Sequence, residues 1–376
     1  DNYPERCFKL SFMISLSLCM IVKNEEKVLP RILKPMKEIV DKILICDTGS
    51  TDRTKEIIRE FTAEVYDFPW KNDFSAARNF ISDKVSTDYW MWLDADDIVT
   101  ENELKKMKAL KSEIDPDTDV VMMKYLTGFD RDGYPAVSYY RERWLRNGKG
   151  FIWKGRVHEA VVPSGKVLYS DIEIEHHKNS ADGSDRNIRI YESMIARDEL
   201  SDPRQVFYYG RELYDHGRYE EAISVFDRFL AEKGAWRENL IDACLQRSLC
   251  FKYLAKPQMR LDSLFYSFRY DLPRAEICCE IGACFMECND HETAAYWYER
   301  ALAAPDCAKY GGFDHSDCRG YIPLMQLCVC YDRLGDHGRA WQYHLRAALI
   351  RPASKEVIEN QKYFERLFVT GRYQEA

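Results

Sequence analysis

The sequence lacks any apolar segment long enough to span a bilayer. The longest candidate, Leu10–Val22, is too short and is interrupted by serines. It runs into the polar stretch Lys23–Glu26, whereas a signal peptide ends in small residues before a cleavage site. We therefore expect neither a transmembrane segment nor a secretion signal. The first residues, 1–14, precede the first clear strand pattern and are expected to be upstream or added sequence.

Paired cysteine motifs are also missing. The 13 cysteines contain no C-x-x-C spacing, and their number is odd, which argues against a disulfide framework or a zinc ribbon. The densest group is expected to pack as small apolar side chains in a helix core, and it comprises Cys278, Cys279, Cys284 and Cys288. Reduced thiols favour a cytoplasmic location.

The chain has no block of basic residues. Its 54 Lys and Arg against 62 Asp and Glu give a net charge of -8, which argues against non-specific nucleic-acid binding. Partners should therefore be sought at a defined site. Because 376 residues exceed one ordinary hydrophobic core, we expect two domains.

Strand-like and helix-like segments alternate from Ser15 onward. The apolar runs 15–22 and 42–46 are each followed by a loop and an amphipathic helix pattern, which predicts βαβ units and a largely parallel sheet. The continuous apolar run 89–93 is typical of a strand covered on both faces. Open α/β sheets bind ligands beyond the carboxyl ends of their strands, where Asp47 and Asp94 stand.

Three acids, Asp94, Asp96 and Asp97, follow this apolar run. Like charges so close together repel one another unless a cation or a hydrogen-bond donor offsets them, and carboxylates suit Mg²⁺ or Mn²⁺. Alternation in an extended segment would send Asp94 and Asp96 to one side and Asp97 to the other. The alternative is a solvated loop in which Asp97 caps the following helix, 101–110.

Several stretches resemble the family 2 nucleotide-sugar glycosyltransferases, which have the GT-A fold. SLCMIVKNEE (17–26), ICDTGSTDRT (45–54) and WLDADD (92–97) match in letters, order and spacing. WKNDFSAARN (70–79) and GRVHEAV (155–161) are similar to the sublancin-type peptide S-glycosyltransferases. The resemblance covers roughly residues 15–178. It implies a Rossmann-like mixed α/β sheet domain, a UDP-sugar donor, a divalent cation (Mn²⁺ or Mg²⁺) and inversion at the sugar carbon.

The resemblance also implies roles for single residues on the donor side. Asp47 would bind the nucleotide base, with a helix cap or a turn acid as the alternative. Arg78 and Asn79 would hold phosphate or nucleotide oxygens, with surface positions on a helix as the alternative. Asp94 would reach the ribose, and Asp96 would ligate the metal that bridges the two phosphates.

The acceptor must lose a proton, and two neighbouring residues are candidates for the base. Glu159 or His158 would take the proton or position the acceptor. His176 would be a further metal ligand, as a late histidine is in relatives of this kind. For each histidine the alternative is a satisfied core or surface ring.

After Asp182 the strand runs give way to helical periodicity. Three copies of one pattern place Ala222, Ala294 and Ala340 at equivalent positions, and a degenerate copy surrounds Leu261. They resemble tetratricopeptide repeats, and the closing GRYQEA (371–376) reads as a fifth, truncated copy. We expect a GT-A domain at 15–182 and an all-α repeat domain at 183–376.

The leading hypothesis is a metal-dependent, inverting glycosyltransferase that moves a sugar from a UDP-sugar to a peptide, protein or glycan. Helical repeats present concave surfaces that hold peptides or partner proteins, so a polypeptide acceptor or a homodimer is expected. The alternative is a non-catalytic nucleotide-binding scaffold. A D-x-D phosphohydrolase of the dehalogenase type is disfavoured, because it needs threonine or valine in place of Ile98 and has no use for Asp47.

Overall fold

The structure, a computed structural model, describes residues 13–62, 64–177, 185–306 and 311–369 and divides into two units. The first unit consists of the chain up to Gly128 together with 140–190, and the second of 129–139 together with the chain from Tyr191. The predicted boundary at 182, most of segment 1–14 and the closing GRYQEA lie outside the described residues. Within the described ranges no helix is long and apolar enough to cross a membrane.

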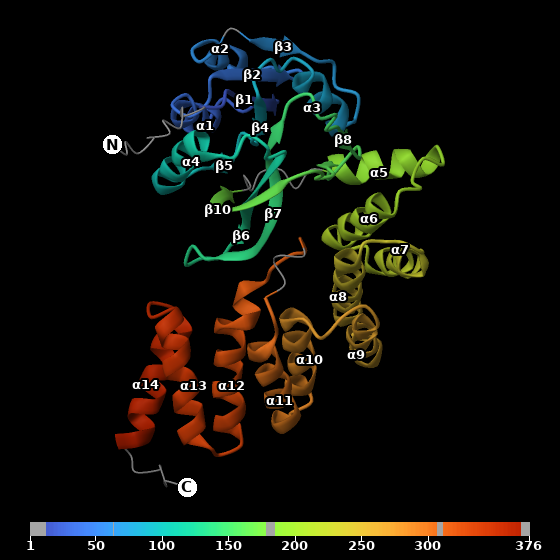
Figure 1. The fold of residues 1–376 in the computed structure, drawn as a ribbon. Helices are drawn as coiled ribbons and strands as arrows, with labels where there is room; N and C mark the ends of the chain where they lie inside the picture. Colours follow the sequence, from blue (N-terminus) through green and yellow to red (C-terminus); the bar gives the residue numbers. More distant parts are fainter. Residues whose placement is uncertain (1–12, 63, 178–184, 307–310, 370–376) are drawn as a thin grey trace, which may run out of the picture. The chain divides into compact units, whose positions relative to one another are not determined.

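An eight-stranded mixed sheet is the centre of the first unit (Figure 1). Its strands are β1 (Leu16–Val22), β2 (Lys42–Asp47), β3 (Val65–Asp67), β4 (Tyr89–Trp92), β5 (Asp97–Ile98), β6 (Val120–Phe129), β7 (Pro135–Arg146) and β10 (Val167–His176). The order is β3-β2-β1-β4-β7-β6-β10-β5, with β1 parallel to β2 and β4, and β7 antiparallel to β4. A small second sheet pairs β8 (Trp153–Lys154) with β9 (Ala160–Val161).

Four helices accompany this sheet: α1 (Leu29–Met36), α2 (Thr54–Arg59), α3 (Phe74–Ser82) and α4 (Glu101–Glu113). Helix α1 has a proline in its first turn, where the missing N–H costs nothing, and it ends one residue after Pro35, which opposes its continuation. Helix α3 packs on β1 and β2. It begins at Asp73, whose carboxylate accepts the backbone N–H of Ala76 and so satisfies a donor that the helix leaves unpaired.

The carboxyl ends of the central parallel strands meet at one edge of the sheet. Val22 of β1 is paired with Asp47 of β2, and Cys19 of β1 with Trp92 of β4, so β2 and β4 end close to the end of β1. All four residues of β4 are buried, as the apolar run predicted. The acids that follow β4 therefore lie at the edge where α/β sheets bind ligands.

The second unit contains a succession of helices (Figure 1). They are α6 (Pro203–Asp215), α7 (Tyr219–Ala231), α8 (Arg237–Tyr253), α9 (Pro257–Tyr266), α10 (Ala275–Glu287), α11 (His291–Ala303), α12 (Tyr321–Arg333), α13 (His337–Ile350) and α14 (Lys355–Val369), preceded by α5 (Arg186–Ala196). Consecutive helices pack against each other. The repeat alanines Ala222, Ala294 and Ala340 are all fully buried, which confirms the helical repeats.

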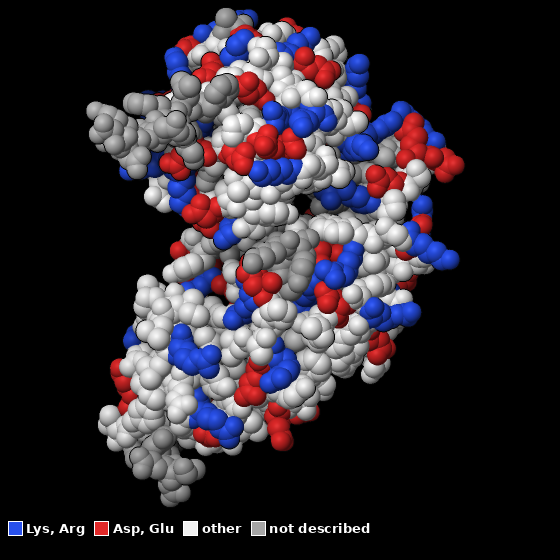
Figure 2. All heavy atoms as spheres, viewed as in Figure 1, with Lys and Arg blue, Asp and Glu red and all other residues white. Residues whose placement is uncertain are grey.

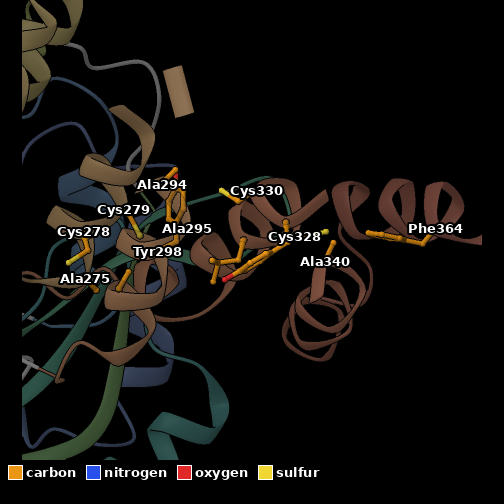
Figure 3. Close-up of a cluster of buried hydrophobic side chains, with 13 residues drawn as sticks. Ala275, Cys278, Cys279, Ala294, Ala295, Tyr298, Cys328, Cys330, Ala340 and Phe364 are labelled. Carbon is orange, nitrogen blue, oxygen red and sulfur yellow. The ribbon is translucent and has the colours of Figure 1, made fainter. Parts of the chain in front are cut away.

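Small side chains let these helices approach closely. In the core cluster of Figure 3, Cys278 and Cys279 of α10 pack with Ala294 and Tyr298 of α11. A Cβ at Gly282 would stand 2.9 Å from the Tyr298 ring, which explains the glycine. The prediction that the cysteine group is core is wrong for Cys288, which is exposed because it follows the last turn of α10.

Candidate active site

Asp47 ends β2 in a buried turn. Its side chain is fully buried, and its Oδ2 accepts the backbone N–H of Gly49 at 3.1 Å and of Ser50 at 3.0 Å. Lys55 Nζ lies 3.5 Å from the same oxygen. Gly49 has φ +105°, a conformation that favours glycine. These are the contacts of the turn acid that the sequence allowed, and the nucleotide-binding role stays a prediction.

The acids after β4 form a turn between β4 and β5. Asp97 donates its N–H to the Asp94 carbonyl at 3.1 Å, and the Asp94 N–H donates to Asp97 Oδ2 at 2.9 Å. The expected extended alternation of Asp94, Asp96 and Asp97 is therefore wrong. The capping alternative is also wrong, because Asp97 is fully buried and the N-cap of α4 is Thr100.

A buried arginine joins two of the predicted site residues. Arg78 of α3 places Nη2 at 2.7 Å from Asp94 Oδ1 and donates its Nε–H to Glu159 Oε1. Its guanidinium lies 4.8 Å from the ring centroids of both Trp92 and Trp153. With only 6% of its surface exposed, Arg78 is not the surface helix residue that the alternative assumed.

This arginine controls the charge of Asp94. Burial acts to raise the pKa of the Asp94 carboxyl, but the attraction and hydrogen bond of Arg78 outweigh it and hold the pKa at about 2. Asp94 is therefore a carboxylate at neutral pH. An ionised acid at the end of β4 can accept hydrogen bonds from sugar hydroxyls or bind a cation.

Glu159 retains an unused acceptor. Glu159 is 9% exposed, and its Oε2 accepts no hydrogen bond from the part of the chain that the structure describes. His158, its neighbour, has φ +50°. Asn79 is bound by the protein itself, since its amide donates to the carbonyl of Trp153 at 3.0 Å and accepts the N–H of that residue at 2.8 Å. Asn79 thus attaches β8 to α3.

His176, the last residue of β10, reaches the acidic turn. Its Nδ1 lies 3.1 Å from Asp97 Oδ1 and 3.5 Å from Asp96 Oδ1. One ligand atom from each of Asp94, Asp97 and His176 lies within 4.8 Å of the other two. Burial raises the pKa of Asp96, and the charges of Asp94 and Asp97 add to this effect while His176 opposes it. Carboxylates grouped with an imidazole fit a divalent cation such as Mn²⁺ or Mg²⁺.

Two further residues at this turn were not predicted. Arg143 of β7 is fully buried, and its Nη1 donates to the Trp92 carbonyl at 3.0 Å and to Asp97 Oδ2 at 3.3 Å. The Tyr125 hydroxyl on β6 donates to Asp97 Oδ1 at 2.7 Å. A signal was available, because charged residues interrupt the apolar end of the strand RERWLR (141–146). Charge inside a buried strand needs a partner.

One face of the molecule shows no large area of a single charge sign among its described residues. On the face drawn in Figure 2, acidic and basic side chains lie interspersed over both units. This distribution agrees with the net charge of -8 and the lack of a basic block in the sequence. Binding through a defined site remains the better expectation.

The fold and the site together define a class. A mixed α/β sheet with acids beyond the carboxyl ends of its parallel strands is typical of domains that bind nucleotides. Residues 17–160 match the model of Glycosyl transferase family 2, so this segment of the chain is similar to that family. The predicted order of an α/β sheet domain followed by helical repeats is confirmed.

Known relatives cover part of the chain. It is 31% identical to the SPbeta prophage-derived glycosyltransferase SunS of Bacillus subtilis over 217 residues, which is 54% of this chain and 50% of that protein. It is 42% identical over 103 residues to a TPR repeat-containing protein of Synechococcus elongatus, covering 27% of this chain and 25% of that one. The chain therefore spans half or less of the length of these relatives.

Solved structures are similar at a low level. The structure of Pseudomonas aeruginosa pilF aligns with 46% of this chain and 72% of its own, at 20% identity and a TM-score of 0.36. Staphylococcus aureus TarS aligns with 69% of this chain and 53% of its own, at 14% identity and a TM-score of 0.33. Likeness at this level supports no assignment of function.

Proposed function

We propose that this protein is a metal-dependent, inverting glycosyltransferase that moves a sugar from a UDP-sugar to a peptide or protein acceptor. One observation carries the proposal. In a segment similar to family 2, a single buried guanidinium, that of Arg78, binds both Asp94 on the donor side and Glu159, the candidate base. Both carboxylates therefore contact the same guanidinium. This arrangement places the candidate base next to the donor-side acid, and a transfer requires donor and acceptor to be held close together.

The donor would lie along the carboxyl ends of β2 and β4. Asp47 would accept the N–H of the uracil base, and Asp94 the ribose hydroxyls. Asp96 and His176, whose Oδ1 and Nδ1 are 3.5 Å apart, are the proposed metal ligands. A divalent cation bound there would offset the charge of the diphosphate and the charge that develops on the departing nucleotide.

The transfer would be a single displacement. The acceptor X–H gives its proton to Glu159 Oε2 while X forms a bond to the anomeric carbon. The bond from that carbon to the diphosphate oxygen breaks, and its electron pair leaves with UDP. The configuration inverts because X attacks from the face opposite the leaving group. By analogy with glycoside hydrolysis, the sugar acquires oxocarbenium-like character, which a nearby carboxylate can stabilise.

The helices of the second unit are the proposed acceptor-binding part. Stacked helical repeats commonly bind peptides. A peptide cysteine is the acceptor that the resemblance to sublancin-type enzymes suggests. A glycan acceptor would leave this unit without a direct part in recognition, so comparing a peptide panel with a glycan panel as acceptors separates the two.

Calorimetric titration with UDP tests the donor site. We expect UDP to bind in the presence of Mn²⁺ and to lose at least about tenfold in affinity without the metal or in Asp96→Asn. A matched control is Asp171→Asn, since Asp171 is an exposed aspartate of the first unit. UDP binding that depends on neither the metal nor Asp96 would refute the metal-dependent mechanism. Metal-dependent binding without UDP release from any UDP-sugar would favour the scaffold alternative.

A further inference from the structure

The carboxylate of Asp97 is saturated with hydrogen-bond donors. Its Oδ1 accepts from the Tyr125 hydroxyl at 2.7 Å and faces His176 Nδ1 at 3.1 Å. Its Oδ2 accepts from the Asp94 backbone N–H at 2.9 Å and from Arg143 Nη1 at 3.3 Å. A carboxylate offers about four acceptor positions, so these four donors use its capacity.

The donors come from four separate parts of the sheet and are fixed by it. Tyr125 lies on β6, Arg143 on β7 and His176 on β10, while Asp94 follows β4. Asp97 and Arg143 are both completely buried. Asp96, by contrast, keeps 23% of its side-chain surface exposed, and its carboxylate faces His176 Nδ1 only at 3.5 Å. The two neighbouring acids are therefore suited to different tasks.

The contact between Asp97 and His176 specifies a tautomer. Asp97 Oδ1 can only accept, so a neutral His176 must carry its proton on Nδ1 to make this hydrogen bond. Its Nε2 then has a lone pair, and Nε2 has no hydrogen-bond partner within the described ranges. A histidine that binds a metal through one ring nitrogen commonly donates the other N–H to a carboxylate.

We propose that Asp97 is a positioning residue which holds His176 in the Nδ1–H tautomer, so that Nε2 is the ligand atom, and that Asp97 does not itself bind the metal. The proposal rests on the metal role given to His176 in the proposed function. It separates Asp97 from the geometric group formed with Asp94 and His176, because proximity alone does not distinguish a ligand from the carboxylate that orients one.

A double-mutant cycle on Mn²⁺ affinity tests this role. Titrations followed by electron paramagnetic resonance, with UDP present, compare the wild-type chain with Asp97→Asn, His176→Ala and the double variant. We expect Asp97→Asn to weaken Mn²⁺ binding about 10- to 100-fold. The double variant should bind no more weakly than His176→Ala, because Asp97 acts through the histidine. Losses that multiply would show Asp97 to be a direct ligand and would overturn the proposal.

A second measurement does not depend on Asp97→Asn folding well. Long-range ¹H–¹⁵N spectra of the metal-free wild-type chain, recorded at a pH high enough that the His176 signals no longer change, report which ring nitrogen of the neutral imidazole carries the proton. We expect Nδ1–H for His176, assigned by comparison with His176→Gln, and a shift toward a tautomer mixture in Tyr125→Phe. A predominant Nε2–H tautomer in the wild-type chain would contradict the proposal.

Failure of the proposed function gives a different result. If His176→Ala left Mn²⁺ affinity unchanged, the metal role of His176 would be wrong, and with it the purpose assigned to Asp97. The control Asp171→Asn, at an exposed aspartate within strand β10 where its pairing with β6 is irregular, should alter neither the Mn²⁺ affinity nor the His176 spectrum.

Discussion

Buried arginines differ between the two units in where their partners lie. Among the described residues, five arginines are almost completely buried: Arg78, Arg143, Arg260, Arg274 and Arg351. The two in the first unit both bind acids of the same turn, 94–97. The three in the second unit each bind a separate pair of carboxylates, namely Glu280 with Glu287, Glu238 with Asp271, and Asp130 with Asp317.

The difference shows how to distinguish buried arginines that belong to a functional site from those that only stabilise the fold. A buried ion pair is weak evidence for stability, because desolvation of the charges offsets much of their attraction. Dispersed pairs, such as that of Arg260 with Glu287, need no explanation beyond the satisfaction of charges between helices. Two buried arginines that converge on one acidic turn concentrate polar groups at a single place, which is where perturbed pKa values and function are expected.

The largest expected effect is that of Glu159→Gln. If Glu159 takes the acceptor proton, its loss should lower kcat by about 10³-fold, since a positioned general base contributes roughly 10²- to 10⁴-fold. UDP affinity should change less than about twofold, because the base does not contact the nucleotide. Steady-state kinetics and calorimetry on the same preparation measure both quantities.

The control for this prediction is Glu173→Gln, since Glu173 is a partly exposed glutamate on β10 that pairs with Lys124. Its kcat should equal that of the wild-type chain. Normal kcat in Glu159→Gln would show that another group, such as His158, accepts the proton. The convergence on Arg78 would then concern donor geometry alone.

The second prediction compares two buried arginines directly. Arg78→Met should lower kcat/KM by about 10²-fold, because Asp94 and Glu159 lose their common partner and misplacement by about 1 Å has that cost. Arg260→Met should leave kcat/KM unchanged. It should lower the free energy of unfolding by roughly 1.5–3 kcal/mol, the usual contribution of hydrogen bonds to charged groups. Kinetics and urea unfolding of both variants provide the measurements.

Equal losses of kcat/KM in both variants would contradict the prediction, since Arg260 would then matter as much for catalysis as Arg78. Equal losses of stability with no change in kcat/KM would also contradict it, since Arg78 would then have only a structural role. The pair is matched because each arginine donates to two carboxylates and exposes 6% of its surface or less.

Much of the fold could be predicted from local pattern. Strand–loop–helix alternation predicts the βαβ order, and the repeated alanines predict the helix pairs, because each signal lies within some 20–40 residues. The positions of Asp47 and Asp94 at strand ends follow from the same pattern. Adjacent parallel strands necessarily bring their carboxyl ends to one edge.

The direction of Asp97 could not be predicted in this way. An alternating pattern assumes an extended backbone, whereas the turn at 94–97 is fixed by Tyr125, Arg143 and His176, which lie 28 to 79 residues away in the sequence. Hydrogen-bond donors from three other strands decide which acid is buried. Local periodicity contains no information on such partners, and so the sequence predicted for Asp97 only the opposite side of the chain or a helix cap.

A third prediction concerns exposed rings of the second unit. Tyr219 and Tyr253 stack with ring centroids 4.7 Å apart, although Tyr253 is 61% exposed. Tyr253→Ala should lower the free energy of unfolding by about 1 kcal/mol, since an aromatic pair contributes roughly 0.5–1.5 kcal/mol beyond its burial. KM for the UDP-sugar should not change. Leu349→Ala, at an exposed apolar side chain of the same unit, is the control. A raised KM for a peptide acceptor in Tyr253→Ala, but not in the control, would show that this part of the second unit contributes to acceptor binding.

The smallest expected effect separates the two ends of β4. Asp88, which precedes the strand, accepts the backbone N–H of Ser15 at 2.8 Å and its hydroxyl at 2.6 Å, and these bonds lower the pKa of the Asp88 carboxyl. A pKa that is lower in the folded than in the unfolded chain adds stability above about pH 4, and this stability is lost as the pH falls through the lowered value. Asn cannot ionise, so Asp88→Asn should be less stable than the wild-type chain at neutral pH, and the difference should shrink in acid.

Urea unfolding at several acidic and neutral pH values measures that difference, with the exposed Asp117→Asn as the control. We expect kcat to be unchanged, because Asp88 lies at the amino end of the strand whose carboxyl end leads into the acidic turn. If the difference in free energy of unfolding between the wild-type chain and Asp88→Asn stayed constant with pH, the contribution of Asp88 would not depend on its charge. A fall in kcat would mean that the two ends of β4 are coupled, and the assignment of function to one edge of the sheet would have to include the other.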